Sequence, residues 1–160
     1  MKKTKPQEKN ALSGGIVSGD IATSMIEVAE QFLYTATSTG VIIRLCGGLG
    51  CWDHSKAAQS IAIESNRKYS DLDFVAYYKD KMGIQKVLDS LGCKEDSSTG
   101  TIPGSRRTIF SAKDNSFHGD VFYDELLFNH KIDFSGRLEC DSRTLPLAEL
   151  LLQKLQIVSI

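Results

Sequence analysis

The chain has 160 residues, of which 41% are apolar and 24% are charged, and it contains only 3 Pro. This composition excludes a fibrous or wholly disordered protein, and the length lets one domain bury a core without disulfides. The formal net charge of −1 excludes a global field that attracts nucleic acid or anionic membrane, so any anion binding is local. Four cysteines without C-x-x-C spacing, and the lack of a signal peptide or long apolar run, favour a cytoplasmic location with no membrane contact.

The N-terminal part predicts a leader and then a helix. Residues 1–18 are polar and rich in Lys, Ser and Gly, which is typical of a flexible segment, so we expect the domain to occupy residues 19–160. From Asp20, a residue that favours the N-cap, apolar side chains recur at helical spacing until near Gly40.

A short buried strand is expected next, over residues 41–46, because the run is apolar and β-branched. It enters the turn Gly47-Gly48, after which a helix can begin near Leu49. Residues 51–70 carry no pattern that settles their structure.

Residues 71–78 have the β-branched and aromatic content of a second strand, which begins with acidic residues. Asp80 then caps a helix with strong 3.6-residue periodicity, and Gly92 stands where a glycine ends such a helix.

The C-terminal third predicts a hairpin of strands over 107–112 and 118–123, followed by shorter strands over 131–134 and 137–140. The last helix is expected to be capped by Thr144, with Pro146 in its first turn, and to run to the last residue without a stop signal, as in a truncated core. The order of these elements predicts an α+β fold, with a mixed sheet of about four to six strands backed by helices.

Three aspartates are the strongest candidates for chemistry. Asp71 and Asp73 are two apart at the start of a strand, so both carboxylates project from one face and can share a hard divalent cation. Such pairs are also common at solvated strand ends. Asp120 lies inside an apolar strand; it is either paired with Arg106 or Arg107 or, if its strand lies beside the first pair, the third carboxylate of a two-metal phosphoryl-transfer site.

Candidate phosphate contacts lie elsewhere in the chain. Gly47-Gly48 at a helix N-terminus can cradle a phosphate, or can simply form a tight turn. Lys154 falls on the stripe of the last helix that carries Leu147, Leu150, Leu151 and Val158, so it either snorkels to water or points into a cleft towards phosphates. Arg67 can act in the same way or belong to a solvated loop.

Taken together, three motifs carry a family resemblance: Arg44 to Gly50 (RLCGGLG), residues 67–74 (RKYSDLDF) and residues 119–122 (GDVF). They resemble the nucleotidyltransferase superfamily of DNA polymerase β-like fold, and residues 141–158 look like the helix after the core in prokaryotic members related to the abortive-infection toxins. The resemblance covers about residues 38–158. Many members have Gly-Ser where this chain has Gly47-Gly48.

The resemblance implies a nucleotidyltransferase core. In such a core Asp71, Asp73 and Asp120 hold two Mg²⁺ ions, for which Mn²⁺ can substitute, while Gly47, Gly48, Arg67 and Lys154 contact the nucleotide. The reaction moves a nucleoside monophosphate from an NTP to a hydroxyl acceptor, which is RNA, a protein or a small molecule.

Two alternatives stay open. The first is a catalytically silent nucleotide-binding or toxin–antitoxin module of the same fold. The second, a D-x-D glycosyltransferase, is disfavoured because such domains usually need a longer chain. The apolar last helix also favours a homodimer that buries it.

Overall fold

The computed structural model describes residues 21–96 and 106–158, so the expected leader lies outside the described residues. The described part begins with α1 (Ile21–Ser38), β1 (Ile43–Leu45), α2 (Gly47–His54) and α3 (Lys56–Glu64). These are followed by β2 (Asp71–Ala76), the 3-10 turn η1 (Tyr78–Asp80), α4 (Lys81–Ser90) and β3 (Cys93–Glu95). The C-terminal part contains β4 (Arg107–Ala112), β5 (His118–Tyr123), β6 (Glu125–Leu127), β7 (Lys131–Asp133) and α6 (Leu147–Val158).

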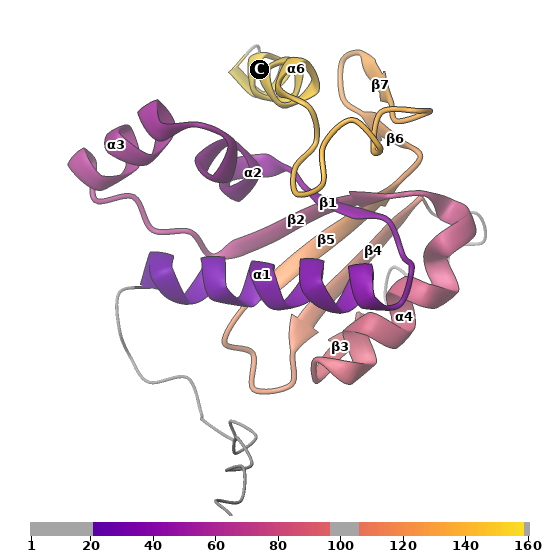
Figure 1. The fold of residues 1–160 in the computed structure, drawn as a ribbon. Helices are drawn as coiled ribbons and strands as arrows, with labels where there is room; N and C mark the ends of the chain where they lie inside the picture. The colour runs from indigo at the N-terminus through magenta and orange to yellow at the C-terminus, as the bar shows by residue number, and fades with distance from the viewer. Residues whose placement is uncertain (1–20, 97–105, 159–160) are drawn as a thin grey trace, which may run out of the picture.

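Five strands form one mixed sheet in the order β1-β2-β5-β4-β3 (Figure 1). β5 runs parallel to β2, whereas the β1–β2, β4–β5 and β3–β4 pairs are antiparallel. β6 and β7 pair separately as a small antiparallel ribbon. The predicted α+β fold with a mixed sheet backed by helices is therefore confirmed.

The larger apolar core lies between the sheet and the helices α1 and α4 (Figure 1). The period-2 alternation of β2 and β5 directs Leu72, Phe74 and Val121 to this face, where all three are fully buried. Phe74 packs against Phe32 of α1, and their ring centroids are 5.3 Å apart. Burial of these side chains fixes the register of the two strands, and with it the direction of every residue on the opposite face.

A second apolar cluster lies on that opposite face, where α6 and the β6–β7 ribbon meet the sheet. It contains Val75 of β2, Phe134 after β7 and Leu150 of α6. Val75 stands two residues after Asp73, so the cluster covers the later part of the face on which the aspartates lie. Asp71 and His118, at the starts of β2 and β5, are exposed. The helical layer therefore leaves this end of the sheet accessible.

Several predicted elements need correction. The second helix begins at Gly47 rather than near Leu49. Residues 137–140 form a turn rather than a strand, because Gly136 has a φ of +66° and the Cys140 N–H bonds the Arg137 carbonyl at 3.2 Å. Asp80 does precede α4, but its side chain makes no capping hydrogen bond.

Thr144 does not cap the last helix, which starts three residues later at Leu147. Its backbone instead forms an isolated bridge with Leu45, and its hydroxyl lies 3.2 Å from Nδ1 of His54. The carbonyl of Pro146 accepts the first helical bond, from Leu150 N–H at 3.0 Å.

The stripe that the sequence predicts on α6 is only partly buried: Leu150 is 1% exposed, whereas Leu147 and Leu151 are each 57% exposed. The buried face instead carries Leu150 and polar side chains. The Gln156 side chain accepts a bond from His130 N–H at 2.6 Å, and Glu149 pairs with Arg137 at 2.5 Å. Polar contacts therefore orient this helix together with Leu150. Among the described helices, none is both long enough and apolar enough to span a bilayer.

Candidate active site

The three aspartates lie on one face of the sheet. β2 and β5 are parallel neighbours, and their register places Asp73 opposite Asp120 and Asp71 opposite His118. Side chains at i and i+2 of a strand share a face, so Asp71, Asp73, His118 and Asp120 form two adjacent cross-strand pairs. The condition set by the sequence, that the strand of Asp120 lies beside that of Asp71 and Asp73, is met.

Asp73 is the half-buried centre of this group. Burial raises its pKa above the ordinary value, and the nearby carboxylates of Asp120 and Asp71 raise it further. The cations Lys154 and Arg107 act in the opposite direction but do not cancel these effects. The ionised form of Asp73 is therefore disfavoured in this structure. A cation bound beside the carboxylate would stabilise that form.

The two outer aspartates already have partners. Arg107 donates two hydrogen bonds to Asp120, from Nε to Oδ1 and from Nη2 to Oδ2, both at 2.8 Å. Nε2 of His118 lies 2.7 Å from Oδ1 of Asp71, which also accepts a bond from the Ser70 hydroxyl at 3.0 Å. The structural role considered for Asp120, pairing with a neighbouring arginine, is thus present.

The glycine turn lies directly against Asp73. Gly47 has a φ of +63°, and a Cβ atom there would lie 2.8 Å from Cγ and 2.9 Å from Cβ of Asp73. Only glycine satisfies both the left-handed backbone and this close approach. The Gly47 N–H donates to Oε1 of the buried Gln153 at 2.9 Å, so α6 holds the turn in place.

The predicted cations approach the same turn from two sides. A Cβ atom at Gly48 would lie 3.5 Å from Nη2 of Arg67, and the Arg67 guanidinium stacks over the Tyr69 ring at 5.2 Å. Lys154, half-buried on α6, lies close enough to lower the pKa of Asp73. The structure thus gathers the residues singled out in the sequence around the Gly47 turn and the start of β2.

The fit of these residues to a metal ion depends on their partners. Within residues 21–96 and 106–158, no three His, Cys, Asp or Glu side chains are arranged to hold a metal ion as they stand. In this structure Asp120 is paired with Arg107, and Asp71 is paired with His118. The donor set itself fits a hard divalent cation, because carboxylate oxygens are the ligands that Mg²⁺ and Mn²⁺ prefer.

Two contributors to this site were not proposed from the sequence. Gln153 could not be assigned to the buried face of α6 because leucines occur on all sides of this helix. The sequence does place it three positions after the core residue Leu150, which is helical spacing for the same face. His118 shares the face of Asp120 because it stands two residues earlier on the same strand, but its contact with Asp71 follows from the parallel register, which the sequence does not state.

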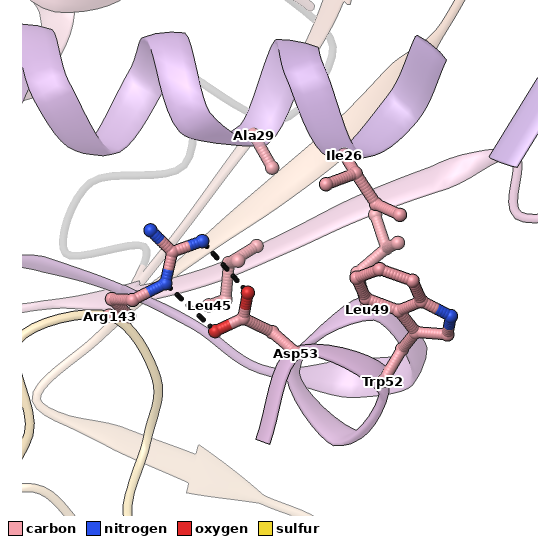
Figure 2. A pocket seen from close by; sticks show the side chains of 7 residues that line it. All are labelled: Ile26, Ala29, Leu45, Leu49, Trp52, Asp53 and Arg143. Carbon is pink, nitrogen blue, oxygen red and sulfur yellow. Dashed lines mark hydrogen bonds and ion pairs between the residues drawn. The ribbon is translucent and has the colours of Figure 1, made fainter. Parts of the chain in front are cut away.

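A small hollow on the other side of α2 is structural. It is lined by apolar side chains of α1 and α2, and Arg143 closes it by donating two hydrogen bonds to Asp53, at 3.0 and 2.8 Å (Figure 2). Arg143 also reaches Glu30 at 3.3 Å and thereby ties α2 to α1.

No known protein family matches the chain, and no curated protein is detectably similar to it. Among solved structures, the fold is similar to the antibiotic-resistance factor ANT(2'')-Ia, with a TM-score of 0.48 and 12% sequence identity. The similarity covers 69% of this chain and 52% of that protein, so the chain spans about half of its length. A likeness at this level identifies neither a family nor an activity.

Proposed function

We propose that this chain is a nucleotidyltransferase that moves a nucleoside monophosphate from an NTP to a hydroxyl acceptor. The observation that carries the proposal is the convergence at Asp73. Its carboxylate is in register with Asp120, shares a face with Asp71 and lies against the Gly47 turn at the N-terminus of α2. Metal-dependent phosphoryl transfer uses carboxylates to hold the metal ion. A helix N-terminus beside them favours binding of the phosphate.

Each group has a distinct task in the proposed reaction. Asp71, Asp73 and Asp120 would hold Mg²⁺ or Mn²⁺, which supplies positive charge for the phosphates and lowers the pKa of the acceptor hydroxyl. The N-terminus of α2 favours the negatively charged triphosphate. Arg67 and Lys154 add positive charge beside it.

The bond changes are those of an in-line displacement. The acceptor oxygen forms a bond to the α-phosphorus as the bond from that phosphorus to the leaving pyrophosphate breaks. The hydroxyl proton passes to a carboxylate oxygen of Asp120, once that oxygen is no longer bonded to Arg107. The products are pyrophosphate and a nucleotidylated acceptor, whether RNA, protein or small molecule.

A second candidate is a catalytically silent nucleotide-binding or toxin–antitoxin module of the same fold. The observation that favours it is the two-pronged Arg107–Asp120 contact, which engages the third carboxylate. In that case nucleotide binds at the Gly47 turn without turnover.

The test uses purified full-length chain with Mg²⁺, cell extract as a source of acceptor, and each α-labelled NTP in turn. We expect label on an acceptor, loss of label with Asp73→Asn, and retention of label with Asp89→Asn. Asp89 is a matched control because it is an exposed carboxylate on α4, outside the site. Its Oδ1 accepts a hydrogen bond from Nε2 of Gln85 at 3.1 Å. Absence of both label and pyrophosphate release refutes the proposed nucleotidyltransferase activity. Calorimetry that then still shows NTP binding supports the silent module.

A further inference from the structure

The contact between Arg107 and Asp120 is the best-formed ion pair at the site. Arg107 is the first residue of β4 and stands opposite Phe122 of β5, so its side chain reaches diagonally along the shared face to Asp120. Its guanidinium lies over the Phe122 ring at 5.3 Å and donates to both oxygens of Asp120. The Arg107 side chain is 49% exposed and that of Asp120 is 19% exposed.

This contact competes with a metal ion for the same group. A guanidinium in fork geometry uses one lone pair on each carboxylate oxygen and places a positive charge beside both oxygens. Two cations close together on one carboxylate repel each other. Arg107 therefore weakens the binding of a metal ion that Asp120 would share with Asp71 and Asp73.

We propose that Arg107 is an exchangeable counter-ion for Asp120, which leaves the carboxylate when divalent metal binds and so sets how much metal the site requires. The inference rests on the proposed function because it concerns the same three aspartates. Arg107 is a positioning residue here, since it acts through Asp120. Its side chain is 49% exposed, so the guanidinium lies at the surface of the site rather than in the apolar core.

The experiment measures Mn²⁺ binding to the full chain by electron paramagnetic resonance, with no nucleotide and no turnover. Arg107→Met keeps the stem over Phe122 and removes the guanidinium. A partly exposed ion pair is worth up to about 1 kcal/mol, so we expect Mn²⁺ to bind more tightly to this variant, by up to about fivefold. A purely structural role for Arg107 predicts the opposite, because damage to the site weakens metal binding.

Arg106→Met is the matched control. Arg106 is the neighbouring residue, is 51% exposed, lies over the Tyr78 ring and is paired with Asp124 instead of a site aspartate. We expect its removal to leave Mn²⁺ affinity unchanged. Unchanged or weaker binding in Arg107→Met, or equal tightening in both variants, overturns the proposal for Arg107.

The two levels of inference fail in different ways. If the wild type binds Mn²⁺ and Asp73→Asn loses that binding, the metal site stands, and the Arg107→Met result alone decides the role of Arg107. If neither the wild type nor Arg107→Met shows Mn²⁺ binding that depends on Asp73, the metal site fails. The proposed function then fails with it, and the counter-ion role fails as well.

Discussion

Replacing Gly47 with alanine tests whether the turn before α2 and the Asp73 carboxylate are packed as tightly as the structure shows. The new methyl group would lie 2.8 Å from Cγ and 2.9 Å from Cβ of Asp73, within the range where atoms must move. The Asp73 side chain would have to rotate away from the turn. The backbone would also be strained, because Gly47 has a φ of +63°.

The expected magnitude follows from these two effects. An alanine in the left-handed region costs about 1–2 kcal/mol, and forcing a methyl group into a filled space costs about 1–3 kcal/mol more. We therefore expect Gly47→Ala to lower the free energy of unfolding by about 2–5 kcal/mol. Gly40→Ala is the matched control, because Gly40 has a φ of +74° but a methyl group added there would meet no atom within 4 Å. It should show the backbone strain alone.

Urea unfolding of the two variants and the wild type measures the difference, with Mn²⁺ binding as a second readout. Gly47→Ala should lose both stability and metal affinity, whereas Gly40→Ala should lose only the smaller increment of stability. Equal losses of unfolding free energy in the two variants would refute the close approach of the turn to Asp73.

Three further predictions concern the same region. Gly119→Ala should destabilise the protein by about 3 kcal/mol in urea unfolding, because its methyl group would overlap the Leu72 carbonyl on the neighbouring strand; wild-type stability would disprove that fit. Gln153→Leu should cost about 1–3 kcal/mol by leaving the Gly47 N–H without its buried acceptor, and a neutral effect in the same assay would argue against this contact. Asp73→Asn should be more stable than the wild type at neutral pH without divalent metal. The pKa of Asp73 is raised in the folded state, so the wild type loses stability as pH rises from the ordinary value of 3.8 through the raised pKa, whereas asparagine does not ionise. Unfolding midpoints measured across this range should converge as pH falls, and a constant difference would contradict the assignment.

Much of the site could be predicted because its determinants are local. The apolar alternation after Asp71 and Asp73 fixes which face the carboxylates occupy, and the same pattern in residues 118–123 fixes the face of Asp120. The hairpin whose second strand contains Asp120 could also be predicted, since a polar connection separates two strongly β-forming runs. What remained open was whether the two strands are neighbours, because pairing between distant strands is set by the packing of the whole chain.

Other features were beyond local reasoning. The helix α3 was missed because residues 51–70 show no clear apolar periodicity. The available signal was Ser55, whose Oγ caps α3 by accepting a bond from Ala58 N–H at 3.3 Å. The choice of Arg107 over Arg106 as partner of Asp120 depends on strand register. Leucines on several sides of α6 concealed its buried face, which Gln153 and Gln156 define.

The parallel pairing of β2 with β5 has a consequence for how the protein is made. A parallel neighbour cannot join through a tight turn, so α4, β3 and β4 must all be accommodated before Asp120 comes to lie beside Asp73. Such long-range closure comes late in folding because the entropy of the intervening chain opposes it. A growing polypeptide on the ribosome therefore displays Asp71 and Asp73 well before it can assemble the full carboxylate group. The three carboxylates can therefore come together only after synthesis has passed β5, the last strand of this sheet in the chain.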